Sequence, residues 1–344
     1  MNNTNNNIEF YTVFNTVLAD IPMRSREIIA KRFGIGEEFP LTLQAIGDEY
    51  NITRERVRQI VQSGLRNISN VDGNVAFMNA RDVITSYIRN NNGILVIDDL
   101  AVLGENNDEY RAIRFLVEGI DEIEYVDNEK YPVKSGAVSL IDFDMNDWNQ
   151  IHNTVKNILQ KKQKTYTSKR LHKELQNSIL NHRQLENYLR VSAEIKQNPF
   201  EKWGFREWDE ISPKGVREKA ILILKEKKEP LHFREITRLM DLYGLSKSGK
   251  KSHPQTVHNE LIRDDKFVLV GRGVYALKTV NHVEGTVKDV IENILENSIE
   301  PLTAEEIIER VLKIRQVQSS TVKVNLNAIA KKLNKKYTLD VGVS

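Results

Sequence analysis

Four long polar side chains lie close together in one predicted helix, at Arg54, Glu55, Arg58 and Gln59. Arginine can donate two hydrogen bonds to guanine, glutamine can pair in bidentate fashion with adenine, and glutamate can accept a hydrogen bond from the cytosine amino group. Residues three and four apart share a helix face, so these side chains form one edge that can enter the major groove of DNA. The alternative is a solvent-exposed helix on which the arginine and glutamate side chains pair with each other.

The residues around this edge predict the two helices that must position it. Residues 42–68 form two amphipathic patterns joined by a short interruption at Asn51, with Thr42 and Thr53 as the N-caps of the first and second helix. We expect Gln62 to face outward with the four polar residues. The apolar positions expected to face inward are Leu43, Ala45, Ile46 and Tyr50 in the first helix, and Val57, Ile60, Val61, Gly64 and Leu65 in the second.

This segment resembles a known family. The strings PMRSREIIAKRFGI at 22–35 and TLQAIGDEYNITRERVRQI at 42–60 resemble region 4 of the primary sigma factors of bacterial RNA polymerase, over about fifty residues. That family reads promoter −35 DNA with a helix-turn-helix. The resemblance implies base-reading positions at Arg54, Glu55, Arg58 and Gln59, and positions on or beside the phosphate backbone at Arg24, Arg32, Thr42 and Arg56.

The sequence also departs from the family. Val61, Ser63 and Gly64 stand where the family has acidic and basic residues late in the second helix. Only about twenty residues precede Pro22, so we expect no counterpart of the sigma region that binds the polymerase clamp and melts the −10 element. Promoter opening by this chain alone is therefore not expected.

The composition excludes several classes of site. The 344 residues include no cysteine, which excludes disulfides and thiolate metal sites and is typical of a reducing cytoplasm. No run of about eighteen apolar residues occurs, so no transmembrane helix and no membrane partner are predicted. The uncharged string MNNTNNN is unlike a signal peptide, and residues 1–10 are predicted to be a disordered leader.

Acidic and basic residues are sorted along the chain. Residues 79–147 carry roughly six lysines and arginines against fifteen acids, a net charge near −9, whereas 151–208 and 213–281 are each near +7. An acidic segment repels phosphate, so the first is expected to contact protein or to mimic DNA. The two basic segments have the sign of charge that DNA requires.

Residues 213–280 contain the order of elements of a winged helix. Helices are predicted at 216–227, 233–242 and 256–264, followed by a hairpin in which 267–270 pairs with 274–277 across Gly271, Arg272 and Gly273. The strings PLHFREIT, VHNELIRD and FVLVGRGVYAL resemble the HARE-type winged helix of the RNA polymerase delta subunit, some restriction enzymes and chromatin proteins. This resemblance implies binding to DNA or to transcription machinery, and it brings no catalytic residues.

Similar orders of elements flank this segment. An acidic copy is predicted from helices at 79–89, 97–103 and 108–118 and strands at 122–126 and 130–133; a basic copy from helices at 148–162, 167–176 and 182–191 and strands at 194–196 and 204–208; a last copy from helices at 285–297, 303–312 and 319–332 and a strand at 337–341. The predicted fold is mainly α with small β wings. A helix-turn-helix at 11–72 precedes tandem winged-helix modules at 79–140, 148–210, 213–280 and 283–344.

No catalytic or cofactor motif is found. HExxH, GxxxxGK and GxSxG patterns are absent, the spacing of His232, His253 and His258 does not suit a metal site, and no cofactor or small-molecule substrate is predicted. The basic string GLSKSGKKSHP at 244–254 is predicted to be a solvated or DNA-contacting loop. Trp203, Phe205 and Trp208 are expected to cover a small core rather than to stack on bases. Further DNA contacts are predicted at Lys250, Lys251 and Arg272.

Three functions follow as alternatives. The leading hypothesis is a non-enzymatic bacterial or phage protein, cytoplasmic and nucleoid-associated, that reads double-stranded DNA and modulates transcription initiation. The second is an accessory factor that binds the RNA polymerase core through protein contacts. The third is the DNA-recognition arm of a restriction or defence system, which would need a partner enzyme because the chain has no nuclease motif.

Overall fold

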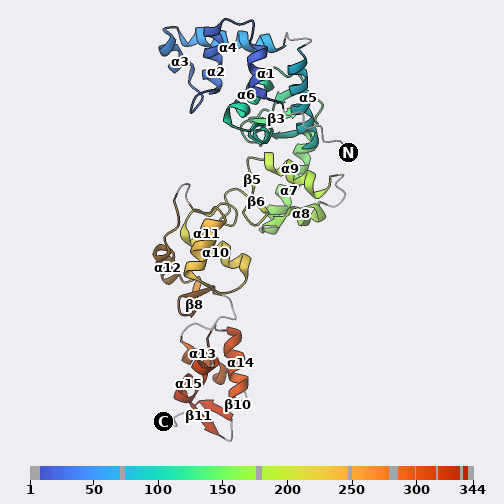
Figure 1. Cartoon of the computed structure of the whole chain (residues 1–344). Helices are drawn as coiled ribbons and strands as arrows, with labels where there is room; N and C mark the ends of the chain where they lie inside the picture. The colour runs from blue at the N-terminus through green and yellow to red at the C-terminus, as the bar shows by residue number, and fades with distance from the viewer. Residues whose placement is uncertain are drawn as a thin grey trace. The chain divides into compact units, whose positions relative to one another are not determined.

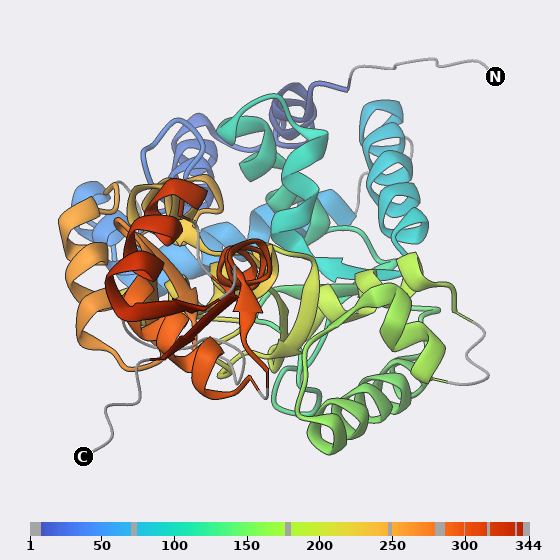
Figure 2. The same ribbon diagram turned by 90° about the horizontal axis from the view of Figure 1, so that it is seen from below.

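A computed structural model shows a chain that is mainly helical with small three-stranded antiparallel sheets, which confirms the predicted fold class (Figures 1 and 2). It describes residues 8–69, 74–175, 180–246, 250–278, 286–298, 300–314, 317–333 and 336–339. Two compact units are present, Met1–Gln197 with Glu201–Arg206, and Asn198–Phe200 with Glu207–Ser344. The predicted leader lies outside the described residues up to position 7, and Phe10 already begins a helix.

The first unit begins with four helices, α1 (Phe10–Val17), α2 (Met23–Phe33), α3 (Leu43–Tyr50) and α4 (Arg54–Ser69). The Thr42 hydroxyl accepts a hydrogen bond from the Ala45 amide, and the Thr53 hydroxyl accepts one from the Arg56 amide, so both predicted N-caps are confirmed. Asn51 ends α3 in the left-handed conformation at a φ of 53°. Gly47 fits this turn because a Cβ there would lie 2.7 Å from the Ile52 carbonyl oxygen.

The inward faces of α3 and α4 are largely as predicted. Ile46 and Val57 are fully buried and form a small hydrophobic cluster with Ile28 of α2. The prediction is wrong for Ala45, which is exposed because it lies on the flank of α3 and not on the face that α4 covers. This cluster fixes α4 against α2 and α3, and so determines which edge of α4 meets solvent.

The acidic segment is a winged-helix-like module. Its elements are α5 (Val75–Asn90), β1 (Ile94–Val96), the 3-10 helix η1 (Ile97–Leu103), α6 (Asn107–Val117), β2 (Ile123–Tyr125) and β3 (Ala137–Leu140), with strand order β1-β3-β2. The strand predicted at 130–133 is wrong, since β3 follows it along the chain. The Asp127 carboxylate accepts hydrogen bonds from the Glu129 and Lys130 amides and closes a turn, and the residues after it pair with 191–193 instead of with β2.

The basic segment consists of α7 (Met145–Lys162), β4 (Tyr166–Thr167), α8 (Ser168–Glu174), α9 (His182–Val191), β5 (Ile195–Gln197) and β6 (Lys202–Phe205), with strand order β4-β6-β5. Helix α7 is the long green helix of Figure 2. Trp203 and Phe205 are buried, which confirms their predicted place in a core, whereas Trp208 is half-buried and follows the end of β6. The predicted cap Thr167 occupies the N-cap position of α8, but its side chain makes no capping hydrogen bond.

The second unit begins with the clearest winged helix of the sequence. It contains α10 (Val216–Lys227), β7 (Leu231–His232), α11 (Phe233–Leu242), α12 (Pro254–Arg263), β8 (Phe267–Gly271) and β9 (Val274–Leu277), with strand order β7-β9-β8. Helices α10 and α11 have the predicted bounds. Gly273 turns the hairpin at a φ of 70°, and a Cβ there would lie 2.8 Å from Nε2 of His232. The wing hairpin therefore forms where it was predicted.

The last module contains α13 (Val287–Glu296), β10 (Leu302–Thr303), α14 (Ala304–Ile314), α15 (Ser319–Ile329), β11 (Ala330–Leu333) and β12 (Lys336–Leu339), with strand order β10-β12-β11. The helix predicted at 319–332 is too long. It ends at Ile329 because residues 330–333 form an edge strand that pairs with β12. The predicted cap Thr303 is confirmed, since its hydroxyl accepts a hydrogen bond from the Glu306 amide.

One hydrophobic cluster runs through both the helix-turn-helix and the acidic module. Phe115 of α6 packs edge-to-face on Phe14 of α1 and on Phe33 of α2, with ring centroids 4.9 and 5.1 Å apart. The buried Glu109 carboxylate accepts hydrogen bonds from the Phe10 and Tyr11 amides at the start of α1. The Arg111 guanidinium donates to the carbonyl oxygens of Gly34, Glu37 and Glu38. These contacts hold the four-helix segment and the acidic module together as one body.

Candidate nucleic-acid interface

The edge of α4 predicted to read bases is exposed. Arg54, Glu55, Arg58 and Gln59 all face solvent at the start of the helix. The Arg58 guanidinium makes a bidentate contact with the Glu55 carboxylate, with Nε 2.9 Å from Oε2 and Nη2 2.5 Å from Oε1. Hydrogen bonds from Arg58 lower the pKa of the Glu55 carboxyl. The pairing that the alternative interpretation required is therefore present, but on an edge that is free to enter a groove.

Exposed ion pairs of this kind are weak, and this decides whether the edge is available. Both side chains are about half exposed, and three residues separate them along the helix. Such pairs contribute about 0.3–0.5 kcal/mol, less than a bidentate contact with a base, which contributes about 1–3 kcal/mol. Exchange of Glu55 for guanine at the Arg58 guanidinium is therefore favourable. The pair holds Arg58 extended along the edge in the free protein.

The residues assigned to the phosphate backbone surround this edge, and all four are exposed. The Arg24 guanidinium donates to the Tyr50 carbonyl oxygen at 2.6 Å and lies over the Tyr50 ring, 5.7 Å from its centroid. Arg32 donates to the Leu41 carbonyl oxygen at 3.2 Å. Arg56 donates to the amide oxygen of Gln59 at 3.2 Å, so these two side chains are held beside each other on α4. Thr42 caps α3, and its hydroxyl is engaged in the cap.

The remaining predicted DNA contacts belong to the second unit. Lys250 and Lys251 are exposed in the loop before α12, and Arg272 is exposed at the turn of the wing hairpin. The Asp241 carboxylate organises the loop, because it accepts hydrogen bonds from the Ser246 hydroxyl and the Ser252 amide. The sequence also contains an exposed polar face on α12 that we did not predict, formed by Gln255, Thr256 and Asn259. Its signal was the helical spacing of polar residues after a basic loop.

The third helices of the acidic and basic modules are not available to DNA. In α6 only Asn107 and Arg114 are exposed, because the helix packs on α1 and α2. In α9 only Arg183 and Arg190 are exposed, because Tyr188 and Val191 pack against Ile94 of the acidic module. The third helix is the element that a winged helix of the helix-turn-helix type inserts into the groove. Sequence reasoning missed this, since both helices carry polar residues at their predicted outward positions.

Comparison with known proteins is consistent with this geometry. Residues 17–70 match the family model described as Sigma-70, region 4, and residues 216–280 match the HARE-HTH model, described as the HTH domain of ASXL and restriction endonuclease proteins. The chain carries a sigma-70 region 4 helix-turn-helix and a HARE-type domain. Both are helix-turn-helix domains of DNA-binding type, and neither is a catalytic domain. The sigma-like segment contains α2 to α4, and the HARE-type segment contains α10 to β9.

Two curated relatives match the sigma-like part. The chain is 33% identical over 73 residues to RNA polymerase sigma factor SigA1 of Synechococcus elongatus, which covers 21% of this chain and 16% of the relative. It is 40% identical over 52 residues to RNA polymerase sigma-C factor of a Nostoc species, which covers 15% of this chain and 12% of the relative. The chain thus matches less than a fifth of the length of either relative.

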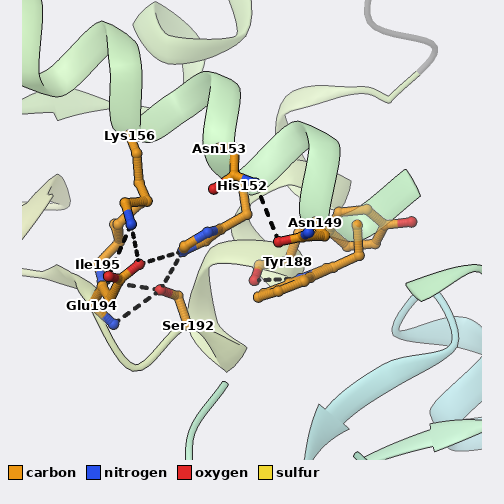
Figure 3. Close-up of polar contacts among 9 residues, drawn as sticks. Asn149, His152, Asn153, Lys156, Tyr188, Ser192, Glu194 and Ile195 are labelled. Atoms are coloured by element: carbon orange, nitrogen blue, oxygen red, sulfur yellow. Dashed lines mark hydrogen bonds and ion pairs between the residues drawn. The ribbon is translucent and has the colours of Figure 1, made fainter. Parts of the chain in front are cut away.

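A buried serine and histidine in the basic module resemble the nucleophile and base of an active site (Figure 3). Nε2 of His152 lies 2.8 Å from Oγ of Ser192, and the Glu194 carboxylate lies 3.8 Å from the same nitrogen. Ser192 is fully buried and its oxygen accepts hydrogen bonds from the Glu194 and Ile195 amides. No substrate can reach that hydroxyl, so the pairing is structural and stabilises the start of β5.

The rest of the described chain adds no metal or membrane site. In the ranges given above, no group of three or more histidine, aspartate or glutamate side chains is placed to hold a metal ion. His232 instead caps α11, with Nδ1 3.2 Å from the Arg234 amide, and His258 stacks on Phe233 with ring centroids 4.3 Å apart. None of the helices in these ranges is both long enough and apolar enough to cross a membrane.

Proposed function

We propose that this protein binds double-stranded DNA in transcription, with α4 in the major groove, and that it modulates transcription initiation. The observation that carries the proposal is the exposed edge of Arg54, Glu55, Arg58 and Gln59 on a helix fixed from behind by a buried cluster. The match to sigma-70 region 4 supports it. The HARE-type domain supplies a second DNA-binding module through α12 and its wing.

Base readout and phosphate contact are expected to separate by mutation. Arg58→Ala removes a bidentate base reader, so sequence preference should fall by about 1–3 kcal/mol, or roughly 5- to 150-fold, while binding to unrelated duplexes changes little. Fluorescence anisotropy with AT-rich promoter fragments and shuffled duplexes of equal composition, in a series of salt concentrations, measures both quantities.

Arg24→Ala is the matched control, because it removes the same charge at a position assigned to the backbone. It should weaken binding to all sequences alike and lower the slope of log affinity against log salt by about 1. Equal loss of preference in both variants would remove the assignment of Arg58 to bases. DNA binding by the wild-type chain that is absent or insensitive to salt would overturn the proposed function itself.

RNA polymerase is a second candidate partner. Both curated relatives are RNA polymerase sigma factors by name, and the acidic module is packed directly against the sigma-like helices. Its net charge makes it a protein-facing surface rather than a DNA-facing one. Co-purification of the tagged full chain with polymerase subunits from a bacterial extract, after nuclease treatment, tests this contact. Recovery that disappears with nuclease would show that DNA alone connects the two.

A further inference from the structure

Four cationic side chains gather around the wing of the basic module. Lys134 lies before β3, Arg190 lies near the end of α9, Lys196 lies on β5, and Arg206 follows β6. Arg190, Lys196 and Arg206 are exposed, and Lys134 is half-buried between the acidic and basic modules. We call these four residues the wing cluster. They come from three separate parts of the chain, so only folding brings them together.

Backbone contacts fix the members of the wing cluster relative to one another. The Lys134 ammonium donates to the Arg190 carbonyl oxygen at 2.5 Å, and the Lys134 amide donates to the Val191 carbonyl oxygen at 2.9 Å. Arg206 is held to the same sheet because its amide donates to the Glu194 carbonyl oxygen at 2.8 Å. Lys196 lies opposite Gly204 in the β5–β6 pair. The cluster is therefore part of a rigid sheet edge and helix end.

The positive charges are close enough to act on each other. Burial lowers the pKa of Lys134, and the charges of Arg206, Lys196 and Arg190 lower it further, against the opposing carboxylate of Asp99. Mutual repulsion of this kind costs folding free energy, and a bound polyanion removes that cost. A hollow beside Arg190 is also lined by Asp99, whose charge repels phosphate. The outer face of the wing is therefore the side on which an anion can lie.

We propose that the wing cluster is a second DNA contact, in which the basic module holds backbone phosphates of double-stranded DNA without inserting α9 into a groove. This inference rests on the proposed function of the chain. Helix α9 cannot enter a groove, since the acidic module covers the face that carries Tyr188 and Val191. The cluster itself consists of cations with no exposed aromatic side chain among them, so it has the means for charge contact and not for base stacking. DNA bound there adds affinity and orientation, but no sequence preference.

The test removes three exposed charges from the wing cluster of the full chain. Arg190→Ala, Lys196→Ala and Arg206→Ala together should lower the slope of log affinity against log salt by about 2–3 and weaken binding to every duplex at least tenfold. The matched control is Lys161→Ala, Lys162→Ala and Lys164→Ala, which removes the same charge from exposed positions at the end of α7 and just after it. A further variant with Arg190→Lys and Arg206→Lys keeps the charges and should retain the slope.

The outcomes separate this inference from the proposed function. If the wing-cluster and control variants lose affinity equally, the effect is one of net charge, and the second contact is overturned. An unchanged salt slope in the wing-cluster variant, with Arg58→Ala still losing sequence preference, overturns the second contact alone. Loss of affinity in the wing-cluster variant while Arg58→Ala keeps full preference supports the second contact and refutes base reading by α4. Circular dichroism of each variant shows whether the module remains folded.

Discussion

Replacement of Phe115 by alanine is expected to destabilise the sigma-like helices as well as the acidic module, by about 3–5 kcal/mol. The Phe115 ring is fully buried and packs edge-to-face on Phe14 and Phe33, which belong to α1 and α2. Its removal leaves a cavity at the centre of the shared cluster. The surrounding helices can close that cavity only in part, because Glu109 and Arg111 fix α6 by hydrogen bonds on either side.

Hydrogen exchange measured segment by segment is the suitable readout, since a chain with two units need not unfold in one step. Amides of α2 should lose protection together with those of α6. Phe39→Ala is the matched control, because the Phe39 side chain is 67% exposed, and its loss should cost less than about 0.5 kcal/mol. Loss of protection confined to α5, α6 and their sheet would show that the sigma-like helices fold independently of the acidic module.

The same contacts show what the sequence could not predict. The periodicity of residues 107–117 predicts a helix, and this is confirmed, but the pattern does not say which module will cover it. Glu109 is counted in the sequence as one more surface acid, yet its carboxylate is buried and caps the start of α1. A contact between residues about a hundred positions apart leaves no local signal. The use of third helices for packing could therefore be found only from the structure.

The candidate DNA edge was more predictable because its determinants are local. The caps Thr42 and Thr53, the turn at Asn51 and the buried positions of α4 are all set within a few residues of one another. The pairing of Arg58 with Glu55 follows from their spacing along the helix. The wing cluster had no such signal, since Lys134 and Arg206 are distant in sequence and only the pairing of 131–134 with 191–193 brings them together.

The strand predicted at 130–133 failed for a related reason. Residues 130–133 contain tyrosine and valine after a turn, so they fit a hairpin as well as residues 137–140 do. Burial decided between them, because Val138 and Leu140 enter the shared core, whereas Val133 packs with Trp148 of the basic module. Competition between modules for one segment cannot be resolved from its composition.

The folding stability of the basic module should fall as the pH falls from about 6.5 to 4. Burial lowers the pKa of His152 from 6.5 to about 4, the Glu194 carboxylate opposes this shift, and the Lys156 ammonium adds to it. The unfolded chain therefore binds a proton between these values while the folded module does not, so acid favours unfolding. The stability is complete above pH 6.5. Below pH 4 about 3 kcal/mol of it has been lost through this residue.

The contacts of His152 explain why the folded state resists the proton. The Ser192 oxygen accepts two backbone amides, so its own proton donates to Nε2 of His152, which must be unprotonated to accept it. The imidazole also stacks on Trp148, with ring centroids 4.9 Å apart and planes 14° from parallel. A charged ring would lose the hydrogen bond from Ser192 and would remain without water in this core.

Urea unfolding followed by tryptophan fluorescence measures this dependence. In a Trp208→Phe background the signal comes from Trp148 and Trp203 alone, since the chain has three tryptophans, and both lie in the basic module. His152→Gln should flatten the fall in stability between pH 6.5 and 4, although it lowers stability at neutral pH. His253→Gln, in the exposed loop before α12, should leave it unchanged. Equal pH slopes with and without the His152 ring would mean that carboxylates, and not this imidazole, control the acid sensitivity of the module.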